Sequence, residues 1–363
     1  MIMARKLVLL IVIGAAALAP ARALADIPPG FIGMSPQSAV KASDFELMRE
    51  AGVSSVRLPL FWTGVQAKSP YLADPHWRTF DHEVELAARE ELRIFPVVFG
   101  TPEWAANEPI DLPVSTPLQR WGWASFLREA AERYGSDGEF WEENPQLPYL
   151  PIKRWEIWNE ENIVSFASEQ NPNKFALLLR ISGRVLHRTD PASEVIIGGF
   201  FGQPLQIPPN IASGDYLDRI YRAGNVKPFF DGVGLHPYVP NAQGMATQIR
   251  TLRRVMRRHR DPATPIYVTE LGWGSSDGPT RWELGLRGQA TQLGRAFQLL
   301  SANRQRWRVR GVWWYTWSDE GGSCSFCRSA GLLTDDRKAK PSWYRFNEWT
   351  GGDAGAVPRA GGE

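Results

Sequence analysis

Eight apolar runs of strand length recur along the 363-residue chain, and this repetition constrains the fold more than any other feature. The runs lie at residues 31–34, 54–58, 93–99, 155–158, 195–199, 232–235, 266–269 and 309–314. They are continuous rather than alternating, as expected for parallel strands that are covered on both faces. Segments with helical periodicity separate them, and clear apolar stripes fall within 118–134, 174–186 and 245–256. Because eight strand–helix units close a parallel sheet on itself, the sequence predicts one α/β domain, a single (β/α)₈ barrel.

The two ends of the chain lie outside this pattern. Arg5 and Lys6 precede an apolar run at 7–19, and the small-x-small triplet at 23–25 follows it. These features predict a signal peptide over residues 1–25 and a secreted, periplasmic or cell-surface protein, and retention of the run as a membrane anchor is the alternative. The barrel then occupies 26–350, and the Gly/Ala-rich residues 351–363 are expected to form a flexible tail.

Composition excludes some partners. The chain has 41 basic and 39 acidic residues, too even a balance for the one-sided field that nucleic-acid binding requires. Arginines 250, 253, 254, 257 and 258 gather opposite the apolar stripe of 245–256, and we interpret them as a solvated helix face. The sequence predicts a monomer with no nucleic-acid partner and no membrane span after processing.

The cysteine and histidine patterns favour no metal centre. Cys324 and Cys327 are the only cysteines, and the five histidines are scattered along the chain. Zinc would need further ligands at suitable spacing, so we predict neither a metal nor another cofactor. In an oxidising compartment Cys324 and Cys327 are expected to form a disulfide that stiffens their loop.

Two glutamates follow strands four and seven of the predicted barrel. Glu160 ends a Trp-Asn-Glu triplet, and Glu270 follows Thr269 and precedes Leu-Gly-Trp. Barrel enzymes gather their functional groups at the carboxyl ends of the strands, so these two side chains should meet. Glycoside hydrolysis requires two such carboxyl groups, one protonated and one ionised.

These two motifs resemble the signatures of the clan A glycoside hydrolases, the four/seven superfamily, and families 5 and 39 most closely. The resemblance covers nearly the whole predicted barrel in element order. It implies a retaining β-glycosidase with Glu160 as acid/base and Glu270 as nucleophile, in which Asn159 binds the sugar 2-hydroxyl group. It further implies that Arg57 keeps the nucleophile ionised and that His236 and Tyr238 line the site of the cleaved sugar.

Aromatic residues supply candidates for the walls of a sugar-binding cleft. The chain has 16 tryptophans, whose indole faces suit sugar rings or fill a large core. The resemblance implies that Trp314 and Trp317 provide an aromatic platform and that Trp104 forms a further wall. We expect loops 100–118 and 275–282 to flank the cleft. Three other acidic residues compete for the role of acid, and we rank them below Glu160: Glu103, Glu156 and Glu161.

The sequence leaves the reaction and the substrate partly open. Its strongest prediction is hydrolysis of a β-linked oligo- or polysaccharide. A non-catalytic carbohydrate-binding barrel and a transglycosylase, which shares the covalent intermediate, remain alternatives. Glucan, mannan, xylan and bacterial exopolysaccharide, and internal or terminal cleavage, are not distinguished.

Overall fold

Eight parallel strands form a closed barrel in the computed structural model, which describes residues 27–37, 40–68, 76–202, 208–322 and 324–357. The strands are β1 (Ile32–Met34), β2 (Ser55–Phe61), β3 (Arg93–Phe99), β4 (Arg154–Asn159), β5 (Glu194–Phe201), β6 (Gly232–His236), β7 (Ile266–Leu271) and β8 (Val309–Trp314). Each predicted run corresponds to one of these strands. The predicted (β/α)₈ barrel is therefore confirmed, whereas the predicted signal peptide lies outside the described residues.

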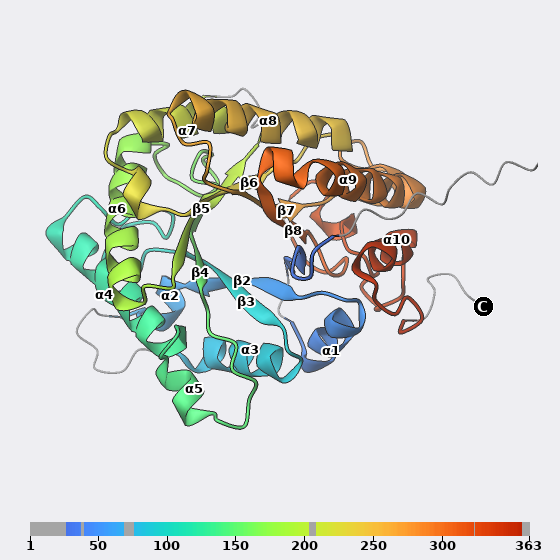
Figure 1. Ribbon diagram of the computed structural model, residues 1–363, viewed down its shortest axis with the longest axis horizontal. Helices are drawn as coiled ribbons and strands as arrows, with labels where there is room; N and C mark the ends of the chain where they lie inside the picture. Colours follow the sequence, from blue (N-terminus) through green and yellow to red (C-terminus); the bar gives the residue numbers. More distant parts are fainter. Residues whose placement is uncertain (1–26, 38–39, 69–75, 203–207, 323, 358–363) are drawn as a thin grey trace, which may run out of the picture.

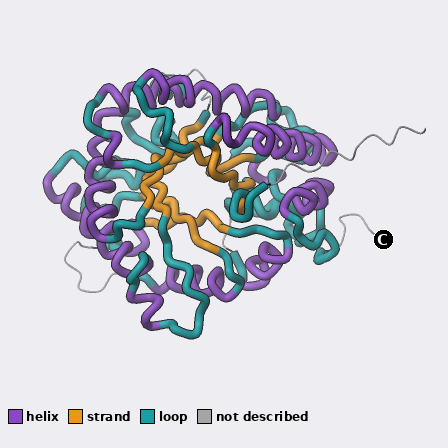
Figure 2. The backbone as a smooth tube through the Cα atoms, viewed as in Figure 1, coloured by secondary structure: helices purple, strands orange, loops and turns teal. Residues whose placement is uncertain are grey.

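Sequential pairing sets the strand order, and β1 closes the ring by pairing with β8. The longest ladder joins β2 and β3 from Ser55↔Arg93 to Phe61↔Phe99. Because all pairs are parallel, the carboxyl ends of the eight strands gather at one mouth of the barrel. The ring of strands lies inside a ring of helices (Figures 1 and 2).

Helices cover the outer face of the sheet. They are α1 (Ala42–Glu50), α2 (Trp62–Val65), α3 (Arg78–Arg89), α4 (Pro117–Tyr134), α5 (Glu139–Glu143), α6 (Pro172–Thr189), α7 (Ser213–Arg222), α8 (Ala242–Arg258), α9 (Gly285–Trp307) and α10 (Pro341–Thr350), with short 3₁₀ turns at Lys227–Phe229 and Cys327–Ser329. The start of α4 is encoded locally: Thr116 accepts a hydrogen bond from the Gln119 N–H and Pro117 occupies the first turn.

The predicted polar face of α8 needs one correction. Arg253 is buried and donates hydrogen bonds to the carbonyl groups of Trp307 and Thr264. The other four arginines of that set are exposed. Arg253 therefore links α8 to the carboxyl end of α9 and to the loop before β7.

Large side chains fill the barrel interior towards the amino-terminal mouth. Phe95, Ile196, Tyr267 and Trp313 form one buried cluster there, with the Phe95 and Trp313 ring centroids 4.9 Å apart. This plug leaves polar side chains to converge at the opposite mouth.

The first residues of the predicted carboxyl-terminal tail pack against the barrel. The Asp353 N–H donates to the Glu50 carbonyl, and the Trp343 indole donates to the Ala354 carbonyl. The first half of the predicted tail is thus attached to the barrel, and residues 358–363 lie outside the described part. Within the described ranges, no helix is long and apolar enough to cross a membrane.

Candidate active site

Two carboxyl groups face each other at the carboxyl-terminal mouth. Glu160 directly follows β4, Glu270 lies in β7, and His236 ends β6. One carboxyl oxygen from each glutamate and a ring nitrogen of His236 all lie within 4.8 Å of one another. The structure thus brings together two residues that are 110 positions apart in the sequence.

Cationic and hydroxyl donors surround Glu270. Arg57 Nη1 lies 2.7 Å from Glu270 Oε1, and the Tyr238 hydroxyl donates to Oε2 over 2.5 Å. Burial alone would lower the pKa of Arg57, but the carboxylates of Glu156 and Glu270 raise it above its ordinary value, so the guanidinium stays charged. Both oxygens of Glu270 therefore accept hydrogen bonds, which is the role of a carboxylate.

Arg57 also orients Asn159. Its Nη2 donates to Asn159 Oδ1 over 2.9 Å, and Asn159 lines the cleft. Because the amide oxygen is occupied, the amide NH₂ group remains available to donate to a ligand.

Glu160 is held in the opposite protonation state. Burial raises the pKa of this carboxyl well above its usual range, and the negative charge of Glu270 adds to the effect. Burial likewise lowers the pKa of His236 well below its usual range, with the positive charge of Arg57 contributing. Glu160 and a neutral His236 are joined by a contact of 2.7 Å between Oε1 and Nδ1.

A chain of hydrogen bonds determines which group carries the proton in this contact. The single hydroxyl hydrogen of Thr269 is donated to Glu156 over 2.8 Å, so Thr269 accepts from His236 Nε2–H at 3.1 Å. A neutral imidazole with its hydrogen on Nε2 has only a lone pair on Nδ1. The proton between Glu160 and His236 therefore belongs to Glu160, which is a carboxylic acid.

The backbone at the end of β4 is unusual. Trp158 and Glu160 have φ angles of 71° and 43°, a left-handed conformation that non-glycine residues rarely adopt. The Trp158 indole donates to the Phe166 carbonyl over 2.6 Å, which helps to hold this geometry. On β5, a Cβ at Gly199 would lie 1.9 Å from His236 Nε2, so only glycine leaves room for the imidazole. Such local strain is typical of functional sites.

An open cleft of about 650 Å³ lies over the two glutamates. Its walls include aromatic residues that the sequence analysis did not assign: Phe166, Phe201, Trp282, Tyr315 and Phe326. Trp282 belongs to loop 275–282, which was expected to flank the cleft. Tyr315 follows β8 directly, and the strand-end rule that identified the glutamates would also have identified it.

The structure does not bring the three predicted tryptophans into this cleft. Trp314 is fully buried and packs near Trp273, because alternate residues of β8 point away from the barrel axis. Trp317 is buried and donates its indole N–H to Asp44 over 2.9 Å. Trp104 packs edge-on against Trp62, with centroids 5.3 Å apart. Tyr315 occupies the platform position that was expected for Trp314 or Trp317.

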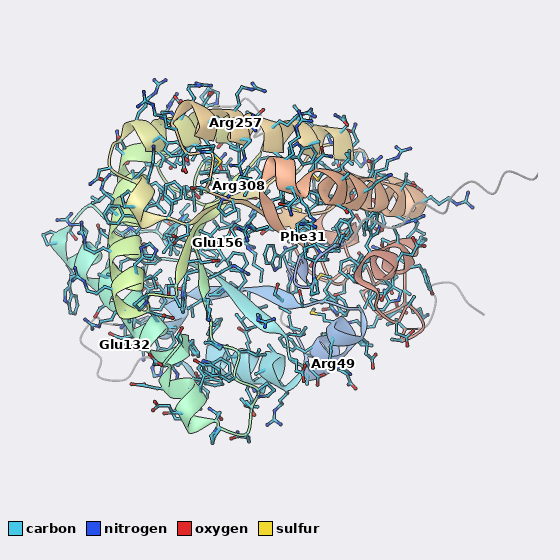
Figure 3. All side chains as sticks on the ribbon, viewed as in Figure 1. Phe31, Arg49, Glu132, Glu156, Arg257 and Arg308 are labelled. Atoms are coloured by element: carbon cyan, nitrogen blue, oxygen red, sulfur yellow. A yellow bond between two sulfur atoms is a disulfide. The ribbon has the colours of Figure 1, made fainter. Side chains whose placement is uncertain are left out.

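The three other glutamates considered for the role of acid lie outside the cleft. Glu156 is fully buried and pairs with Arg57, with Nε and Oε2 2.5 Å apart; it is labelled in Figure 3. Glu161 is fully buried, its pKa is raised well above normal by burial, and neither carboxyl oxygen has a hydrogen-bond partner among the described residues. Glu103 is exposed on the loop after β3. Neither Glu103, Glu156 nor Glu161 lines the cleft.

Glu160, His236 and Glu270 are also residue types that bind metals. They form the one group of potential metal ligands found among the described residues. However, Arg57 already supplies positive charge 2.7 Å from Glu270, and Glu160 carries a proton that a metal would displace. The donor set therefore fits a metal poorly.

The predicted disulfide between Cys324 and Cys327 is present, and both residues line the cleft. The Tyr315 hydroxyl lies 3.0 Å from Cys327 Sγ. The disulfide loop therefore packs against the aromatic wall beside Glu270.

Comparisons with known proteins agree with this fold. A family 39 glycoside hydrolase from Bacteroides cellulosilyticus WH2 has a TM-score of 0.64 and 22% identity, over 89% of this chain and 63% of that chain. A GH39 β-xylosidase from Caulobacter crescentus has a TM-score of 0.62 and 19% identity, over 90% and 72% of the two chains. TsXylA, an intracellular xylanase from Thermoanaerobacterium saccharolyticum, has a TM-score of 0.56 and 16% identity, over 88% and 98%.

Sequence comparison gives a more distant match. A β-xylosidase from Geobacillus stearothermophilus is 24% identical over 135 residues, which covers 33% of this chain and 26% of that enzyme. The chain thus spans about a quarter of this curated relative, and no protein-family model matches it. The resemblance to clan A barrels, with family 39 among the structural neighbours, is confirmed for the fold.

Proposed function

We propose that this protein is a retaining glycoside hydrolase that cleaves β-linked oligo- or polysaccharide by double displacement. The observation that carries the proposal is the pairing of a protonated Glu160 with an Arg57-bound Glu270 across less than 4.8 Å. Retaining enzymes place their carboxyl groups about 5–5.5 Å apart, whereas inverting enzymes leave about 6.5–9.5 Å for a water molecule. The observed spacing favours retention.

Each group has one role in each step. Glu270 attacks the anomeric carbon while Glu160 donates its proton to the departing oxygen, so the glycosidic C–O bond breaks and a covalent glycosyl ester forms. Glu160, now ionised, removes a proton from water as the water oxygen attacks the same carbon. The sugar is released with its original anomeric configuration, and both glutamates return to their starting states.

We propose a xylose-containing substrate. The neighbours named above include a β-xylosidase, a xylanase and the distant β-xylosidase relative. The aromatic walls around the cleft suit pyranose faces, and Asn159 presents its amide group for a sugar hydroxyl.

The test uses 4-nitrophenyl β-D-xylopyranoside and linear xylo-oligosaccharides, with the corresponding glucosides and mannosides for comparison. We expect hydrolysis of the xylosides, and proton NMR should show the β-anomer of xylose first. Glu270→Gln should abolish release, and Glu132→Gln on the exposed face of α4 is the matched control. An α-anomer as the first product would contradict retention, and dominant transfer to added xylose would identify a transglycosylase.

We further propose that the protein is exported. The basic residues and apolar run before residue 25 support export, and so does the disulfide, because disulfides persist in oxidising compartments. Mass spectrometry of the protein from culture medium or periplasm should show a start at Asp26 and no free thiol. An intact amino terminus would favour the anchored alternative.

A further inference from the structure

A second hollow, of about 840 Å³, opens at the amino-terminal mouth of the barrel, opposite the glutamates. The starts of β2, β3, β4 and β8 and the end of α9 contribute to it. Its lining residues are Pro28, Pro29, Gly30, Phe31, Ser54, Ser55, Arg93, Arg154, Arg304, Gln305, Arg308, Val309 and Arg310. Phe31 and Arg308 are labelled in Figure 3.

Every charged residue that lines this hollow is an arginine. Five arginines contribute to its wall, and no acidic residue does. Arg93, Arg308 and Arg310 are exposed, whereas Arg154 is half-buried and pairs with Glu194 beside the hollow over 2.6 Å. A concave surface lined by one sign of charge concentrates counter-ions.

The basic surface extends beyond the hollow. A smaller adjoining hollow of about 320 Å³ shares Arg93 and Arg154 and adds Lys153, which is exposed. Arg306, next to the wall on α9, is exposed as well. The chain as a whole carries a formal charge of only +2, so this concentration is local.

The path of the chain indicates what this surface faces. Pro28 and Pro29 belong to the wall, so the described part of the chain begins at this mouth. The sequence before it contains the apolar run at 7–19, of the type that enters a membrane during export. While the chain carries this run, before cleavage or in the anchored alternative, the face beside Pro28 and Pro29 is the one nearest to the lipid surface, whose phosphate groups are negatively charged.

We propose that the arginine-lined hollow binds the phosphate groups of an anionic phospholipid surface and holds the barrel there with the glutamate-bearing mouth directed away. Arginine donors match phosphate oxygens in charge and in geometry. This inference concerns a surface remote from the glutamates and does not depend on the proposed hydrolysis.

The experiment measures sedimentation of the full-length chain with vesicles of phosphatidylcholine alone or mixed with phosphatidylglycerol. Every variant keeps the apolar run, so the ratio of binding to anionic and neutral vesicles reports the basic surface. In Arg93→Gln/Arg310→Gln this ratio should fall roughly 25-fold, about fivefold for each arginine. Added salt should lower the ratio for the unmodified chain, because the attraction is screened.

Two matched variants distinguish the effect of the arginines at the hollow from the effect of the net charge of the protein. Arg254→Gln/Arg287→Gln removes the same charge from exposed positions on α8 and α9 and should change the ratio less than twofold. Arg93→Lys/Arg310→Lys should retain most of the binding. An equal loss in the α8/α9 variant, or no loss in the Arg93/Arg310 variant with an unchanged melting temperature, would overturn the proposal. Full competition by soluble glycerol 1-phosphate would overturn it too, because the hollow would then be a site for a small anion.

Discussion

The two glutamates of the cleft, Glu160 and Glu270, lie in opposite electrostatic environments. Glu270 lies against the Arg57 guanidinium and the Tyr238 hydroxyl, both of which donate to it. Glu160 donates a hydrogen bond to a neutral His236, and burial raises the pKa of Glu160. Environment rather than residue type therefore separates an ionised carboxylate from a carboxylic acid within one site.

The largest expected effect is the loss of activity when the carboxylate of Glu270 is removed. Glu270→Gln keeps the shape of the side chain but eliminates the nucleophile, so kcat should fall by about 10⁴-fold or more. Steady-state hydrolysis of 4-nitrophenyl β-D-xyloside measures the change. A loss of less than tenfold would assign the nucleophile to another residue.

Replacement of Glu160 should reduce activity by an amount that depends on the leaving group of the substrate. Glu160→Gln should lower kcat/KM about 10²- to 10⁴-fold for xylo-oligosaccharides, which need proton donation, but far less for aryl xylosides with acidic leaving groups. Glu161→Gln is the matched control, because Glu161 is buried outside the cleft. Equal losses in the two variants would contradict the assignment of Glu160.

The hydrogen-bond chain behind Glu160 predicts a change in pH dependence. In Thr269→Val, His236 loses the acceptor for Nε2–H and can place its hydrogen on Nδ1, which would stabilise ionised Glu160. The pKa of Glu160 should then fall, and the alkaline limb of the kcat/KM profile should move to lower pH by roughly one unit. Thr269→Ser should keep the original profile. Both variants keep every one of the charged and titratable side chains around Glu160: Arg57, Glu156, Glu161, His236, Tyr238, Glu270 and Tyr315. Thr269→Val also removes the hydroxyl that donates to Glu156, and Thr269→Ser keeps it. An unmoved limb in Thr269→Val would show that this chain does not control the acid.

The smallest effect concerns stability rather than rate. Burial raises the folded-state pKa of Glu161 above its unfolded value near 4.3. Its contribution to stability is complete below that unfolded value and is lost as pH rises towards the folded pKa. Glu161→Gln should therefore flatten the decline in the free energy of unfolding as the pH rises above the unfolded value. Urea denaturation measures this, and an identical slope in Glu161→Gln would contradict it. Glu132→Gln, on the exposed face of α4, is the control.

Local sequence was sufficient for the barrel and for its two principal glutamates. The strand runs are short, apolar and regularly spaced, and a residue at the end of a parallel strand must lie at the carboxyl-terminal mouth. Asn159, His236 and Tyr238 follow the same rule, whereas Arg57 lies within β2 and reaches Glu270 through its long side chain. The structure places all four beside Glu160 or Glu270. Their roles in binding and catalysis remain predictions.

The aromatic residues that line the cleft were not predicted correctly from the sequence. The family resemblance predicts Trp314 and Trp317, at and after the end of β8, as the aromatic platform, yet both are buried. Side chains on a strand alternate between the two faces, so a shift of one residue decides between cleft and core. Tyr315 and Trp282 reach the cleft because of where the chain turns after β8 and within the loop after β7.

The sequence by itself determined the order of strands and helices, the pairing of the cysteines and the identity of the two facing carboxyl groups. Only the tertiary structure decided which carboxyl group holds a proton, which aromatic rings line the cleft, and that five arginines meet at the opposite mouth. Periodicity acts between residues close in the chain, whereas charge, burial and hydrogen bonding act between residues that the barrel brings together from distant strands.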